Sequence, residues 1–139
     1  QLDHEKCYGC GECIVTCRHD AIKENSESSS KLLQEKMAEF AYGAVKDKKG
    51  KVFYINFLTH ITKKCDCINE AQEKIVPDIG IMAAFDPVAI DQAAIDMLTK
   101  LAGADILREL WPENDYNIQI EHAEKIGLGS RSYELIEID

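Results

Sequence analysis

Apolar and polar residues follow one another along the chain in a pattern that predicts helices interleaved with short strands. After a polar break at residues 25–30, apolar residues recur at helical spacing and predict a helix with one buried face: Leu33, Met37, Phe40, Ala41, Ala44 and Val45. A lysine-rich turn follows, and an almost unbroken apolar run over residues 52–58 then predicts a strand. Because this run does not alternate, we expect both faces of the strand to be covered, as in a parallel sheet.

The second half of the chain continues this pattern. Residues 79–85 are a second apolar run, and Asp86-Pro87 predicts a helix start, because Asp accepts hydrogen bonds from first-turn amides and Pro suits the first helical position. We expect that helix to end at Gly103 and to bury Val88, Ile90, Ala94, Met97, Leu98 and Leu101. Helices over 104–111 and 116–126, the latter capped by Gly127, and a closing strand over 133–138 complete the prediction.

Strands that alternate with helices predict an α/β fold, with a partly parallel sheet and flanking helices. Residues 1–25 are expected to form a half-ferredoxin iron–sulfur loop, and residues 26–139 the α/β domain. Three strands are too few for a complete doubly wound sheet, and the chain begins at Gln1, so we expect a fragment of a larger protein. No basic leader with an apolar stretch is visible, which favours a cytoplasmic location.

Composition and charge exclude two classes of function. The 139 residues carry 16 Lys and Arg against 25 Asp and Glu, a net charge of −9, which argues against nucleic-acid binding because such modules show a basic footprint. No apolar run approaches the ~20 residues that cross a bilayer, so we expect no membrane span. Residues 31–64 are an exception, at net +5. They are either a solvated turn or a docking surface for an acidic partner.

The strongest chemical signal is a run of cysteines at Cys7, Cys10, Cys13 and Cys17. This spacing is typical of ferredoxin loops that bind a [4Fe–4S] cluster, and soft thiolates suit an iron–sulfide core. Gly9 and Gly11 lie where the backbone must turn tightly. A zinc site is the weaker alternative, because zinc sites usually combine two separated Cys-x2-Cys pairs, and a disulfide framework is the other. We therefore predict an iron–sulfur cluster.

The fourth ligand of this cluster is left open by the sequence. In two-cluster ferredoxins the last cysteine of such a run ligates the other cluster, so Cys17 either closes the first cluster or points away from it. Cys65 and Cys67 are the other candidates. If one of them closes the first cluster, the other can join Cys17 in a second metal site or a disulfide. Cys65 and Cys67 are otherwise two incidental thiols in a loop.

Residues 3–24 resemble a bacterial-type ferredoxin domain, although Arg18 replaces the proline that usually follows the fourth cysteine and no second cysteine run is present. Nearly all of the chain is similar to the C-terminal part of the uncharacterised iron–sulfur-centre protein family, a domain of unknown function with a ferredoxin insert. This resemblance rests mainly on residues 41–46, 57–59, 65–67, 75–81 and 86–93. It implies a cluster and a missing N-terminal α/β half, and it implies no particular reaction.

Several polar residues have both a chemical and a structural interpretation. The aspartates weighed as acid–base or metal groups are Asp78, Asp86, Asp91 and Asp96, of which Asp86 is better explained as a helix cap. His60 is either a metal ligand or an ordinary surface residue. Asn56 must find partners if it is buried, and Trp111 is expected in the core.

These observations favour one-electron transfer through a single [4Fe–4S] cluster, with a redox partner protein or the missing N-terminal domain as partner. The alternatives are the C-terminal half of a cluster-dependent enzyme and a structural metal-binding domain. No nucleophile–histidine arrangement can be recognised, so the sequence identifies no catalytic residue. No oligomeric state follows from these residues.

Overall fold

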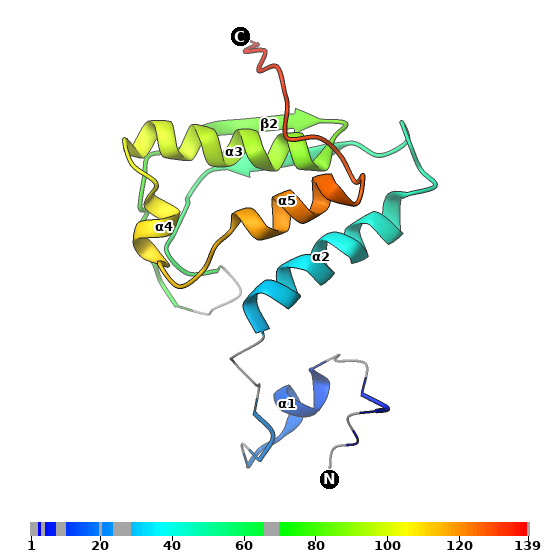
Figure 1. The fold of residues 1–139 in the computed structure, drawn as a ribbon. Coiled ribbons are helices and arrows are strands. Elements are labelled where there is room, and N and C mark those ends of the chain that lie inside the picture. Colours follow the sequence, from blue (N-terminus) through cyan, green and yellow to red (C-terminus); the bar gives the residue numbers. More distant parts are fainter. Residues whose placement is uncertain are drawn as a thin grey trace. The chain divides into compact units, whose positions relative to one another are not determined.

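The computed structural model describes residues 3, 5–7, 11–19, 21–23, 29–65 and 70–138. The chain divides into two compact units, Gln1–Ser30 and Lys31–Asp139; the predicted boundary between residues 25 and 26 lies outside the described residues. The first unit contains helix α1 (Glu12–Thr16). The second contains nearly all of helix α2 (Ser29–Val45), strands β1 (Tyr54–Leu58) and β2 (Gly80–Ala84), and helices α3 (Pro87–Ala102), α4 (Ile106–Leu110) and α5 (Asn117–Lys125) (Figure 1).

The two strands form an antiparallel pair, so the prediction of a parallel arrangement is wrong for them. Tyr54 lies opposite Ala84, and Leu58 lies opposite Gly80. A parallel pair needs a crossover connection, usually a helix. The described part of the connection over 59–79 contains no helix and includes a short antiparallel bridge between Thr62 and Lys74, so the chain simply reverses direction.

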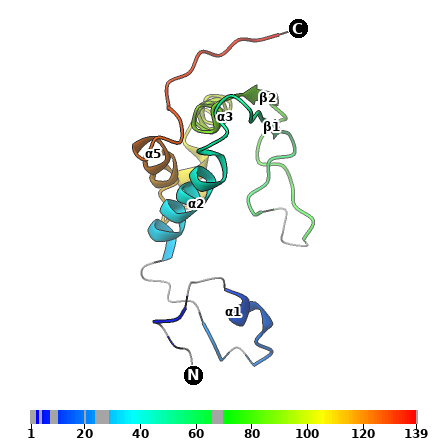
Figure 2. The same ribbon diagram turned by 90° about the vertical axis from the view of Figure 1, so that its right-hand side faces the viewer.

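Only one face of this sheet is covered within the described residues. Figure 2 shows α3 between the sheet and helices α2 and α5, and α3 contacts both strands. Burial alternates along β1 and β2, because side chains that face α3 are partly buried and their neighbours are not. The opposite face is apolar and exposed: Phe53, Ile55, Phe57, Ile81 and Phe85 are each more than half exposed. The lack of alternation in the sequence therefore reflects two apolar faces, of which this unit covers one.

The hydrophobic core lies where α2, α3 and α5 meet, and it is built from Ala38, Val88, Ile120 and Ala123. The apolar stripe predicted for α2 does not enter this core, because Leu33, Met37 and Phe40 are 56%, 50% and 80% exposed. The residue of α2 that enters the core is Ala38, which is 3% exposed. Helix α2 therefore joins the core through Ala38, and the larger apolar residues of α2 lie at the surface.

The start of α3 is fixed by one carboxylate that also holds a distant loop. Asp86 Oδ1 accepts hydrogen bonds from the amides of Val88 (2.8 Å) and Ala89 (3.0 Å), which confirms the predicted cap. Its Oδ2 accepts a third bond from the amide of Ser130 (2.9 Å). The predicted end at Gly103 is also confirmed, in the left-handed conformation (φ 74°) that suits glycine. The Asp86 side chain therefore joins α3 to the segment after α5.

The predicted closing strand over 133–138 is not formed. These residues have no strand assignment among the described part of the chain, and they extend away from the helices (Figure 1). The segment is anchored at its start, where Arg131 Nε donates to Gln92 Oε1 (2.8 Å) and the Tyr133 hydroxyl donates to Asp96 Oδ2 (2.7 Å). Beyond this anchor Ile136 and Ile138 are 73% and 88% exposed, since no neighbouring strand pairs with them here.

Candidate metal centre

The cysteine run enters helix α1 through a tight turn at Gly11. This residue has φ 75°, a conformation that costs glycine little and other residues more. Its carbonyl accepts hydrogen bonds from the amides of Ile14 (2.9 Å) and Val15 (3.2 Å). The turn places Cys13 in the first turn of α1, and Cys17 directly follows the helix. Gly9 and Cys10 lie outside the described residues.

The described cysteines of the run differ in their surroundings. Cys7 is exposed, whereas Cys13 and Cys17 are partly buried. The amide of Ala21 donates a hydrogen bond to Cys17 Sγ (3.4 Å). An N–H donor of this kind favours the thiolate over the thiol, and amide bonds to sulfur are one of the means by which proteins tune iron–sulfur centres. Cys17 therefore has the polar environment of a ligand.

These residues fit an iron–sulfur cluster by donor type and by spacing. Three thiols of the run lie in one small unit, at a turn made by glycine and beside an amide that donates to sulfur. In the described residues no three His, Cys, Asp or Glu side chains gather closely enough to hold a metal ion; this set excludes Cys10. Small metal sites commonly assemble as the metal binds, because ligand convergence and folding are coupled.

Cys65 belongs to the other compact unit, where it is exposed and lines a surface pocket. Its sequence neighbours Asp66 and Cys67 lie outside the described residues. Cys65 and the run at residues 7–17 are therefore parts of separate units.

His60 takes part in a small polar arrangement at the end of β1. It has φ 52°, which is uncommon for a residue with a side chain. Its backbone amide donates to Asp78 Oδ1 (2.7 Å), and Lys74 Nζ lies 2.8 Å from Asp78 Oδ2. The bond from the His60 amide, followed by the bond from Lys74, lowers the pKa of Asp78 below its usual 3.8. The Asp78 carboxylate thus stabilises an unusual backbone conformation.

This arrangement predicts a pH-dependent contribution to stability. Because the folded pKa of Asp78 is lowered, its contribution is present above pH 3.8 and is lost as the pH falls through the folded pKa. We expect Asp78→Asn, which keeps an oxygen for the His60 amide, to lower the urea midpoint at pH 6 and to match the original protein below the folded pKa. Urea unfolding of both proteins between pH 6 and pH 2.5 tests this. A difference in urea midpoint between the two proteins that does not change with pH would contradict this prediction.

The other aspartates weighed as chemical groups also make structural bonds. Asp91 Oδ1 accepts a hydrogen bond from Asn56 Nδ2 (3.1 Å), so the strand asparagine has found a partner on α3. Asp96 accepts bonds from Gln92 and Tyr133, and Asp86 caps α3. Each of these three carboxylates therefore has a structural hydrogen-bond partner.

The basic turn that follows α2 lies at a second surface cavity. Lys46, Lys48 and Lys49 are exposed and line this cavity of about 460 Å³ with the start of α3 and residues 127–130. Lys48 Nζ donates to the carbonyl of Ala44, where a cation suits the carboxyl end of a helix. The turn is solvated and positively charged, which is compatible with both predictions made for it.

Comparison with known protein families identifies a related family. The family model described as Domain of unknown function (DUF362) matches residues 7–96. No curated protein and no solved structure matches the chain significantly. Among the described residues, no helix combines the length and the apolar character needed to cross a membrane.

Proposed function

The chain belongs to the DUF362 family, and from this premise we propose that it is an iron–sulfur protein that transfers single electrons through one [4Fe–4S] cluster. The family is associated with iron–sulfur proteins, and the match begins at Cys7, the first cysteine of the run. The proposed ligands are Cys7, Cys10, Cys13 and Cys17. When bound, such a cluster supplies one-electron redox chemistry.

The observation that carries this proposal is the amide of Ala21, which donates to Cys17 Sγ in the same small unit as Cys7 and Cys13. Such a bond favours a thiolate at Cys17 and makes it the best candidate for the fourth ligand. Gly11, in a left-handed conformation, is the residue at which α1 begins, and Cys13 lies in the first turn of that helix. In the proposal these residues bind and orient the cluster, and they set its reduction potential through amide–sulfur bonds.

The exposure of the unit favours electron exchange with a partner rather than buried chemistry. Cys7 is exposed, and α1 contains no buried residue. The exposed turn of Lys46, Lys48, Lys49 and Lys51 offers positive charge in a chain of net −9, and such a patch steers the approach of an acidic partner. The proposed partner is therefore a redox protein, or another domain, with an acidic docking surface.

A structural metal site is the second candidate, and one observation favours it. In the described part of the first unit, helix α1 has five residues and none of them is buried. Domains this small usually need a metal or disulfides to fold. A metal held only for structure would explain the unit without redox chemistry.

Metal analysis of anaerobically purified protein separates the two candidates. We expect about four irons and four acid-labile sulfides per chain, as one [4Fe–4S] cluster requires, and an EPR signal that appears on reduction with dithionite. Zinc in place of iron would favour the structural site and would contradict electron transfer. About eight irons would indicate a second cluster and would contradict the single-cluster proposal.

A further inference from the structure

A surface pocket in the second unit has the properties of a small-molecule site. Its volume is about 450 Å³, which is within the usual range for ligand pockets. It lies between the loop at residues 63–65 and the α4–α5 region, and Lys63, Leu107, Trp111 and Tyr116 are among its walls. Trp111 was expected in the core, but it is 43% exposed, because one side of the indole borders this pocket.

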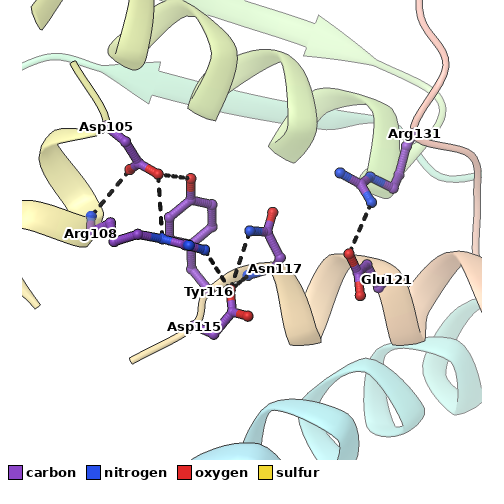
Figure 3. A network of polar contacts seen from close by, with 7 residues as sticks. All are labelled: Asp105, Arg108, Asp115, Tyr116, Asn117, Glu121 and Arg131. Carbon is purple, nitrogen blue, oxygen red and sulfur yellow. Dashed lines mark hydrogen bonds and ion pairs between the residues drawn. The ribbon is translucent and has the colours of Figure 1, made fainter. Parts of the chain in front are cut away.

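The two aromatic walls are held in place by polar contacts. Trp111 Nε1 donates to the carbonyl of Lys63 (3.2 Å), and the Tyr116 hydroxyl donates to Asp105 Oδ2 (2.8 Å). Figure 3 shows Arg108 lying between Asp105 and Asp115. Arg108 Nε is 3.7 Å from Asp105 Oδ2, and its terminal nitrogen is 3.2 Å from Asp115 Oδ1. Side chains fixed before binding lose little entropy when a ligand arrives, so the rings form a preorganised surface.

The charges around the pocket favour an anion. Lys63 Nζ lies 5.6 Å from the centroid of the Trp111 ring, and in the described residues it has no carboxylate partner. Lys64 is already paired with Glu70 (2.6 Å), and Arg108 balances the two aspartates behind Tyr116. Burial, with the bond to Asp105, raises the pKa of Tyr116, so its hydroxyl stays neutral at neutral pH. Among the described residues that line the pocket, Lys63 is thus the cation without a carboxylate partner.

We propose that this pocket binds a planar aromatic carboxylate, whose ring lies against Trp111 and Tyr116 and whose negative charge is met by Lys63. Aromatic rings attract one another in stacked or edge-to-face arrangements, and an ammonium beside them adds selectivity for an anion. The site lies within the second unit and does not depend on the proposed cluster.

The test uses the full chain labelled with ¹⁵N and the probe 2-naphthoate. Trp111 is the only tryptophan, so its single indole N–H cross-peak reports on the pocket directly. We expect a saturable shift of this cross-peak, and at least fivefold weaker binding of the neutral 2-naphthamide. An indole cross-peak that does not move while amides of β1 and β2 shift would place the ligand on the exposed sheet face and would overturn the proposal. Equal binding of acid and amide would also overturn it.

Lys63→Gln is the matching variant, because it removes the charge and keeps most of the side chain. We expect it to lower the affinity for 2-naphthoate about fivefold and to leave that for 2-naphthamide unchanged. Lys100→Gln on exposed α3 surface is the control and should bind as the original protein does. Equal affinity of Lys63→Gln and Lys100→Gln for 2-naphthoate would contradict the role of Lys63. The comparison of 2-naphthoate with 2-naphthamide in the original protein tests the preference for an anion independently of both variants.

Discussion

Replacement of Cys13 by serine is expected to abolish the reducible cluster, with iron falling from about four per chain to less than one. Cys13 lies in the first turn of α1, two residues after Gly11, so the helix holds the proposed ligand in place. A serine oxygen is a poor ligand for an iron–sulfide core, which prefers soft sulfur donors. Iron and acid-labile sulfide assays, together with EPR after dithionite, measure the loss.

The same substitution at Cys17 and at Cys65 identifies the fourth ligand. Cys17 lies in the unit of the cysteine run and accepts the Ala21 amide, whereas Cys65 lies in the other unit. We expect Cys17→Ser to lose iron and Cys65→Ser to retain it. The reverse result would assign the fourth position to Cys65, and it would show that the two units come together around the cluster.

Gly129→Ala is expected to destabilise the second unit by about 2–3 kcal/mol. A Cβ atom at Gly129 would lie 2.6 Å from the carboxylate carbon of Asp86 and 2.8 Å from its Oδ2, well inside contact distance. Either the carboxylate leaves the amides of α3, which costs about 1–2 kcal/mol for a lost cap, or the loop moves with the strain of an overpacked site, about 1–3 kcal/mol. The change in free energy of unfolding is measured by urea denaturation.

Gly43→Ala is the matched control, since the same methyl group is added where nothing lies within 4 Å. Gly43 lies inside α2, where alanine is favoured over glycine by up to about 1 kcal/mol, so a small stabilisation is expected. Combination of Gly129→Ala with Asp86→Ala should cost little more than Asp86→Ala alone, because the two residues share one contact. Full additivity of the two changes would contradict this explanation.

Local signals in the sequence were sufficient to locate both ends of α3. Helix α3 is capped by Asp86 at its start and by Gly103 at its end, as predicted. Such ends can be predicted because a cap depends on one side chain and the few amides next to it. Val88, Ile90 and Leu98 are buried as predicted, whereas Leu101 is 47% exposed. Its neighbours on the helix are covered by the sheet, by α4 and by α5, and the sequence of α3 alone does not say where that cover ends.

Predictions that depend on distant parts of the chain were less successful. The apolar run of β1 predicts that both faces of the strand are covered, but Ile55 and Phe57 are exposed and the partner strand is antiparallel. Apolar composition indicates that a face can be buried, and it carries no information on strand direction or on whether a partner is present. The stripe of α2 fails for the same reason, because Ala38 rather than Phe40 meets the core.

The two candidate sites differ in how far sequence could reveal them. The cysteine run is local, so spacing alone predicts its ligands and suggests the tight turn at Gly11. The aromatic pocket combines Lys63 with Trp111 and Tyr116, which lie 48 and 53 residues further along the chain. No spacing rule links these positions, and the sequence predicts Trp111, the sole tryptophan, for the core and not for a pocket wall.

The core built from Ala38, Val88, Ile120 and Ala123 bears on how this chain can be divided. The residues that match the family model end at 96, inside α3 (Pro87–Ala102), and half of the core residues lie beyond that point. A protein fragment cut to the matched residues would keep the cysteine run but would expose the α3 surface that α5 covers. The residues that match the family model are therefore not the residues of an autonomously folding unit. Expression of the second unit needs the chain through Ser130, because the Ser130 amide donates a hydrogen bond to Asp86.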